Sequence, residues 1–135
     1  MFDLFTDQDR LRRRAFRKAS HPVMIKYYAS PFSDIKSRWD QLEIVSLDFE
    51  TSGLKPEQHQ ILSYGKVHIR HGAIHLATAR HELVLAETSI PESSAIIHHI
   101  TDDRASQGRP LQQVLPELLE ALAGKVMLVH YHKIE

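Results

Sequence analysis

Residues 41–54 read QLEIVSLDFETSGL, an almost continuous apolar run that ends in two acidic residues. Such a run is typical of a central strand covered on both faces of its sheet. Asp48 and Glu50 lie two residues apart, so their side chains share one face, with Cα atoms roughly 6.5–7 Å apart. Two carboxylates held this close need a counter-charge, and no Lys or Arg lies between Gln41 and Gly53. We therefore predict a divalent cation at this strand end; the alternative is two solvated residues on an edge strand.

The segments that follow predict an antiparallel meander. Residues 55–60 are polar and contain a proline, which predicts a loop. Residues 61–70 and 73–83 alternate as strands, and the intervening His71-Gly72 predicts a tight turn in which the glycine supplies a positive φ. The first three predicted strands therefore lie side by side in chain order.

A helix and a fourth strand are predicted next. Apolar residues recur with helical spacing over residues 111–122. Pro110 suits the first turn and Gly124 the position after the helix, whereas Pro116 predicts a kink or a short first turn. Residues 125–129 are a short apolar strand. Because a crossover helix between strands of one sheet is right-handed, this strand should lie parallel to the first.

Composition limits the class of protein. With 135 residues, 42% hydrophobic and 25% charged, the chain suits one globular domain. It has no cysteine, which excludes disulfides and thiolate metal sites and makes a reducing cytoplasm the expected location. No apolar run approaches the ~18–20 residues that cross a bilayer, and the N-terminus carries charges where a secretory signal would be apolar. We expect a soluble, cytoplasmic protein.

A charge asymmetry divides the chain. Residues 1–40 carry nine Lys/Arg against five Asp/Glu, and residues 41–135 carry eight against twelve. We predict a helical basic arm over 1–40, separate from a domain over 41–135. Six of the nine residues in 10–18 are basic, which suits contacts to a phosphate backbone; the alternatives are a solvated helix face, or an arm docked on the domain or on a partner. The candidate phosphate contacts are Arg12, Arg13 and Arg14.

Three segments carry a family resemblance. Asp-Phe-Glu-Thr followed by Ser-Gly-Leu, after an apolar strand, resembles the first motif of the DEDD (DnaQ-like) 3′→5′ exonucleases. That family includes the proofreading subunit of bacterial DNA polymerase III and RNase T. Residues 97–101, IHHIT, are similar to its Val-His-Gly-Ile-Thr/Ala segment, with His99 where Gly is usual. Residues 128–135, LVHYHKIE, resemble the second motif, His-Asn-Ala-x-Phe-Asp, with His130 at the leading His and Glu135 in place of the Asp.

The resemblance implies a fold and a reaction. The fold is an α/β RNase H-like exonuclease domain with three antiparallel strands, a crossover helix and a parallel fourth strand. The third motif, Tyr- or His-x₃₋₄-Asp, has no match, so the resemblance covers about residues 42–135 and implies a C-terminally incomplete domain behind the basic arm. The implied chemistry is two-metal hydrolysis with Mg²⁺ or Mn²⁺ that releases nucleoside 5′-monophosphates from single-stranded 3′ ends, DNA being favoured over RNA.

Residue roles follow from the same resemblance. Asp48 would bridge both metals, Glu50 would hold one, and Glu135 would act on the second, although Glu135 could equally be a free last residue. His98 would lie beside a base or sugar, or be a partly buried, hydrogen-bonded histidine. The residues implied to contact substrate are Thr51, Leu54, His98 and His130.

Two further expectations concern activity and partners. Because the third motif is absent, we expect the chain alone to be weakly active or inactive. The alternative function is a non-catalytic nucleic-acid- or partner-binding module that uses the arm. The open sheet or the arm could also support self-association or binding to a protein partner.

Overall fold

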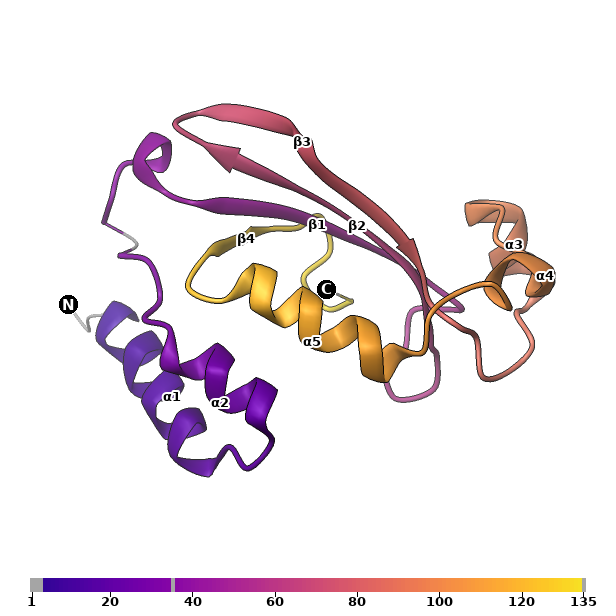
Figure 1. Cartoon of the computed structure of the whole chain (residues 1–135), viewed down its shortest axis with the longest axis horizontal. Coiled ribbons are helices and arrows are strands. Elements are labelled where there is room, and N and C mark those ends of the chain that lie inside the picture. The colour runs from indigo at the N-terminus through magenta and orange to yellow at the C-terminus, as the bar shows by residue number, and fades with distance from the viewer. Residues whose placement is uncertain (1–3, 35, 135) are drawn as a thin grey trace.

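The computed structural model describes residues 4–34 and 36–134, which form a sheet with three helices along one side and two short helices beyond one end of the strands (Figure 1). In chain order the elements are α1 (Leu4–Lys18), α2 (Pro22–Ala29), the 3₁₀ helix η1 (Trp39–Gln41), β1 (Ile44–Thr51), β2 (Ile61–Arg70), β3 (Ala73–Leu83), α3 (Glu92–His98), α4 (Asp102–Ala105), α5 (Leu111–Leu122) and β4 (Val126–Leu128). No helix in these described ranges is long and apolar enough to cross a membrane.

The sheet has the predicted topology. Its strand order is β3-β2-β1-β4, with β1 antiparallel to β2 and parallel to β4. The bounds predicted for the second and third strands, 61–70 and 73–83, are those of β2 and β3. In the turn between them His71 and Gly72 both have positive φ, 49° and 71°, which is the conformation that a two-residue hairpin needs.

The main core lies between the sheet and α5 (Figure 1). The odd-numbered β1 residues Val45 and Leu47 are buried against the predicted helical stripe, of which Val114, Leu118 and Leu122 are buried. Since side chains alternate along a strand, the even-numbered residues Asp48 and Glu50 point to the opposite face. The core therefore decides which face carries the acidic pair.

The N-terminal end of α5 differs slightly from the prediction, because Pro110 precedes the helix as its N-cap residue. Gly124 follows the C-cap residue Ala123 with a φ of 71°, as predicted. The helix continues through Pro116, although proline cannot donate the hydrogen bond expected at this position. A short separate first turn is therefore not formed.

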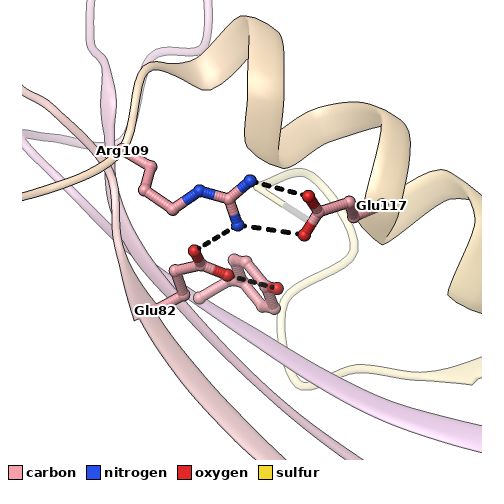
Figure 2. Close-up of polar contacts among 4 residues, drawn as sticks. Glu82, Arg109 and Glu117 are labelled. Atoms are coloured by element: carbon pink, nitrogen blue, oxygen red, sulfur yellow. Dashed lines mark hydrogen bonds and ion pairs between the residues drawn. The ribbon is translucent and has the colours of Figure 1, made fainter.

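An ionic network ties α5 to the sheet (Figure 2). Arg109, just before α5, donates to Glu82 of β3 at 2.7 Å and to both carboxylate oxygens of Glu117 at 2.6 and 3.0 Å. The hydroxyl of Tyr64 donates to the other oxygen of Glu82 at 3.1 Å. Burial, aided by the hydrogen bond to Glu82, raises the pKa of Tyr64 to about 12.

The backbone beside this network passes unusually close to its neighbour. A Cβ atom on Gly108 would lie 2.4 Å from the carbonyl carbon of Val84 and 2.6 Å from the amide nitrogen of Leu85. The same two stretches of backbone exchange hydrogen bonds, from Arg109 N to Leu83 O and from Leu85 N to Arg109 O. Only glycine fits at position 108 without a backbone shift.

One strand irregularity was not predicted. Lys66 of β2 faces Arg80 of β3 while His68 faces His75, so residues 76–79 of β3 stand opposite a single residue of β2. The Thr78 hydroxyl accepts a hydrogen bond from the backbone N–H of His68 at 2.9 Å. A side chain thus replaces one backbone partner at this bulge, where the ladder of backbone hydrogen bonds is interrupted.

The arm contacts the domain through its second helix. Tyr27 of α2 packs against the main core, and Lys26 forms an ion pair with Glu120 of α5 at 2.5 Å. The Ser33 hydroxyl donates to the carbonyl of Gly124 at 2.9 Å. Part of the predicted arm is therefore docked on the domain, as one of the sequence-based alternatives has it.

Candidate active site

A cavity of about 340 Å³ opens where β1 ends, between the turn that follows β1, α3 and residues 131–134. It gathers three segments that lie far apart in the sequence, and these are the three segments that resemble exonuclease motifs. Its lining residues are Phe49, Glu50, Thr51, Ser52, Gly53, Leu54, Ser93, Ser94, Ile97, His98, Tyr131 and Ile134.

The two predicted metal ligands lie at the end of β1. Asp48 is exposed and Glu50 is half-buried, and only Glu50 lines the cavity. Neither carboxylate has a cationic partner among residues 4–34 and 36–134. Glu135, the third predicted ligand, lies outside the described residues, and the described part of the chain contains no group of three or more His, Asp or Glu residues placed to hold a metal.

The surroundings of this pair leave room for a cation. Across the sheet Asp48 faces Gly65, and a Cβ atom on Gly65 would meet nothing within 4 Å. Glu50 faces Ser63, whose buried hydroxyl has no hydrogen-bond partner. Carboxylate and hydroxyl oxygens are the donors that Mg²⁺ and Mn²⁺ prefer. The donor set therefore fits a hard divalent cation, with two carboxylates as its charged ligands.

The turn after β1 is held by its own hydrogen bonds. The Thr51 hydroxyl donates to the carbonyl of Gly53 at 2.8 Å, and Ser52 closes the loop through two hydrogen bonds with Gln60. This turn presents Leu54 at the cavity with 73% of its surface exposed. An apolar side chain exposed beside a cavity is available to pack on a flat ligand.

His98 connects α3 to the end of β1. Its Nδ1 accepts a hydrogen bond from the N–H of Ile100 at 3.0 Å, so the ring proton lies on Nε2. Nε2 lies 3.0 Å from the hydroxyl of Ser94, and that hydroxyl donates to the carbonyl of Thr51 at 2.9 Å. Both ring nitrogens are therefore occupied within the chain, which fits the predicted alternative of a hydrogen-bonded histidine, while the ring still lines the cavity.

Ser94 is a site residue that the sequence prediction does not include. It is only 9% exposed, and its hydroxyl contacts Thr51 at the end of β1 and His98 of α3. A usable signal exists, because Ser94 and His98 are spaced i, i+4 and are therefore neighbours if the segment is helical. That inference needs a helix over residues 92–98, which the resemblance alone does not supply.

His99 occupies a strained backbone position. It ends α3 as the C-cap residue with a φ of 57°, in the left-handed region. The resemblance puts glycine at this position, and glycine adopts this conformation without a steric penalty. The carbonyl of His99 accepts a hydrogen bond from Arg104 at 3.0 Å, which helps to hold His99 in this left-handed conformation.

The segment that resembles the second motif lies partly in the cavity wall. Tyr131 and Ile134 line the cavity, and the Ile134 N–H donates to the Tyr131 carbonyl at 2.9 Å. His130 does not line the cavity, in contrast to the substrate contact implied for it. Tyr131, which stands where the family motif has Asn, lines the cavity in place of its neighbour His130.

The predicted phosphate contacts of the arm lie elsewhere. α1 is at the opposite end of the molecule from α3 (Figure 1). The Arg12 side chain is only 10% exposed, forms an ion pair with Asp9 at 2.7 Å and donates to the Tyr28 carbonyl. Arg13 pairs with the other oxygen of Asp9 at 2.6 Å, and these two arginines lower the pKa of Asp9. Arg12 is therefore a packing residue of the arm, whereas Arg14 is exposed.

The comparison with protein families agrees with this geometry. The family described as exonuclease, of the RNase T type, matches residues 45–134. This chain belongs to that DEDD exonuclease family. The matched range spans β1 through the residues after β4, and thus all three segments around the cavity.

The relatives are much longer than this chain. DNA polymerase III of the PolC type from Thermotoga petrophila is 33% identical over 94 residues, which cover 70% of this chain and 7% of that protein. The same protein from Thermotoga maritima matches with the same identity and coverage. The similarity therefore concerns one small part of each polymerase.

Solved structures share the fold. Exonuclease I of E. coli in complex with a 5cy-dT13 oligonucleotide has a TM-score of 0.58 at 11% identity, over 66% of this chain and 20% of that chain. A moderately thermophilic exonuclease I from Methylocaldum szegediense has a TM-score of 0.57 at 12% identity, over 65% and 20%. At these identities the likeness shows the DnaQ-like fold alone.

Proposed function

We propose that this chain is a metal-dependent 3′→5′ exonuclease domain that removes nucleoside 5′-monophosphates from nucleic-acid 3′ ends. The observation that carries the proposal is the single cavity shared by Glu50, Thr51, Leu54 and His98, which come from two segments more than forty residues apart. Family membership supplies the reaction class. Every motif-like segment of this chain borders the cavity, which makes the cavity the expected place of that reaction.

Asp48 and Glu50 would hold the cation, Mg²⁺ or Mn²⁺. When bound, it would stabilise the charge that develops on the phosphate and lower the pKa of attacking water. The unpaired state of both carboxylates and the open space at Gly65 support this assignment. A second ion in the family's manner would need Glu135 or a further ligand, and it remains an expectation of the resemblance.

The remaining residues would bind the terminal nucleotide. Leu54, exposed at the cavity, would pack on the terminal base, and Tyr131 would form part of the wall that the base meets. His98 would hold the cavity wall in position and would not transfer a proton, because its two ring nitrogens are hydrogen-bonded to Ile100 and Ser94. Through Ser94 it would fix Thr51 beside the nucleotide.

Single-stranded DNA is the proposed substrate. Support comes from the names of the relatives, a DNA polymerase and an exonuclease I bound to an oligonucleotide. A cytoplasmic location remains a prediction from the absence of cysteine. The alternative function is a non-catalytic nucleic-acid- or partner-binding module. The observation in its support is that arginines of α1 are exposed.

Calorimetric binding of Mn²⁺, followed by thymidine 5′-monophosphate, tests the site whatever the turnover rate. We expect Asp48→Asn and Glu50→Gln to abolish metal binding. Leu54→Ala should weaken nucleotide binding and leave metal binding unchanged. Asp103→Asn, at an exposed position of α4 that does not line the cavity, is the matched control and should change neither. Metal binding that survives both site substitutions would contradict the proposal.

A further inference from the structure

A second charged feature lies on the other face of the sheet, the face that α5 covers in part. The sheet register places Leu47, Lys66 and Arg80 in one row across β1, β2 and β3, and Val45, His68 and His75 in the next row. Val45 and Leu47 are buried in the core beneath α5, so the β2 and β3 residues of both rows share that face. Lys125, just before β4, is close enough for its charge to act on Lys66. We call Lys66, Arg80 and Lys125 the sheet-face cation cluster; His68 lies beside it.

The cluster is unfavourable for the folded chain by itself. Lys66 and Arg80 are directly opposite on neighbouring strands, and like charges in such a pair destabilise a sheet. Burial, together with the charges of Arg80 and Lys125, lowers the pKa of Lys66. His68 is only 9% exposed, and its Nδ1 has no hydrogen-bond partner. A buried polar atom without a partner needs an explanation such as a ligand.

The acidic residues nearby do not neutralise the cluster. Glu43 pairs with Arg70 at 3.5 Å, and Glu82 is bound by Arg109 and Tyr64. Within residues 4–34 and 36–134, neither Lys66 nor Lys125 forms an ion pair. Arg80 donates to the backbone carbonyls of Ala77 and Ala79 rather than to a carboxylate.

Lys125 also borders the arm. It lines a cavity of about 780 Å³ between α1 and β4, together with Arg12 and Arg13. Asp9 pairs with both arginines, whereas Lys125 forms no ion pair among the described residues. Of these three cations, Lys125 is therefore the one available to an anion.

We propose that the sheet-face cation cluster binds the phosphate backbone of a nucleic-acid strand, at a site distinct from the 3′-end cavity. Repeating phosphates match several neighbouring cations, and such contacts are independent of sequence. The choice of nucleic acid as the anion rests on the proposed function. A site of this kind would hold the body of the strand while its end is processed.

Fluorescence anisotropy of a labelled oligothymidine, measured in EDTA over a range of salt concentrations, tests the proposal. EDTA removes the metal, so cleavage does not contribute to the signal. We expect Lys66→Gln/Lys125→Gln to weaken binding roughly tenfold or more at low salt. The slope of log affinity against log salt should fall by about 1.4, at ~0.7 for each of the two phosphates that are no longer neutralised. The control is Lys36→Gln, an exposed lysine outside the cluster, compared with each single cluster substitution.

Stability measurements separate binding from structure. Removal of like charges should leave the melting temperature of the cluster variant unchanged or higher, so weaker binding cannot be attributed to unfolding. Lys125→Gln alone, ahead of β4, repeats the test without a change inside the sheet. Equal losses in the cluster and control variants would overturn the proposal, as would unchanged binding. Tighter, cluster-dependent binding of oligoglutamate would overturn it in favour of an acidic protein partner.

Discussion

The Nε2 atom of His98 lies 3.0 Å from the hydroxyl of Ser94, whose own proton is directed at the carbonyl of Thr51 at 2.9 Å. This relay joins α3 to the last residue of β1, at the point where the acidic pair ends. Among residues 4–34 and 36–134, the hydrogen bonds of His98 go to Ser94 and Ile100 and not to a carboxylate. The position of Thr51 therefore depends on a residue more than forty positions away in the sequence.

Two substitutions at His98 separate its hydrogen bonds. Gln can place a donor near the position of Nε2 and retain the Ser94 contact, whereas Asn can only retain the acceptor for Ile100. Because each hydrogen bond that is removed costs about 1 kcal/mol, both variants should lower the free energy of unfolding. Only His98→Asn should weaken thymidine 5′-monophosphate binding, measured by calorimetry. Equal nucleotide affinity of the two variants would show that the relay to Thr51 has no role.

Gly108 should tolerate no side chain. In Gly108→Ala the added methyl would collide with the backbone of Val84 and Leu85, and we expect a loss of about 2 kcal/mol or more in urea unfolding. Gly65→Ala is the control, since its Cβ would meet open space and its φ is not positive. That variant should be neutral or up to ~1 kcal/mol more stable. Similar losses at both positions would contradict the close approach of the two backbones.

His99→Gly should stabilise the protein. Relief of the left-handed strain at φ 57° is worth about 1 kcal/mol, less the larger entropy that glycine has in the unfolded chain. His99→Ala keeps the strain and should give no gain, which makes it the control. Urea unfolding of the three proteins measures the difference. A glycine variant no more stable than the alanine variant would mean that position 99 is unstrained.

The pKa of His68 predicts how stability changes with pH. Burial lowers this pKa, aided by the charges of Lys66, Arg70 and Lys125, while Glu43 opposes the shift; the opposite residue on β3 is His75. As pH falls through ~6.5, the unfolded chain takes up a proton that the folded chain does not, so the free energy of unfolding falls.

His68→Gln removes this titration and should flatten the pH dependence between about pH 7.5 and 5.5. The control is His75→Gln at the exposed position opposite, which should keep the slope of the unsubstituted protein. Urea unfolding at several pH values measures both slopes. If the slope is unchanged in His68→Gln, His68 titrates normally and the cation cluster does not act on it.

The sheet could be predicted from sequence because its signals are local. Alternation over 61–70 and 73–83 and the turn at His71-Gly72 fix three strands, and the apolar stripe of 111–122 fixes the helix and hence the parallel fourth strand. The bulge at Thr78 could not be predicted, because it depends on a hydroxyl that replaces a backbone partner across the sheet.

The site could be predicted only in part. Thr51, Leu54 and His98 follow from motif-like segments that the fold brings to one cavity. The role of Ser94 depends on a short helix placed against β1, and the burial of Arg12 depends on a carbonyl sixteen residues away. Both are tertiary contacts, and no local spacing specifies them.

The central claim, that this chain removes nucleotides from 3′ ends, is tested most directly with one strand labelled at either end. In Mn²⁺ we predict slow loss of the 3′ label and stepwise shortening of the 5′-labelled strand, both abolished by Asp48→Asn and by EDTA. The sequence-based expectation is a chain that is weakly active or inactive, and the central claim requires weak activity. Full-length strands after prolonged incubation with bound Mn²⁺, or shortening that survives Asp48→Asn, would contradict the claim.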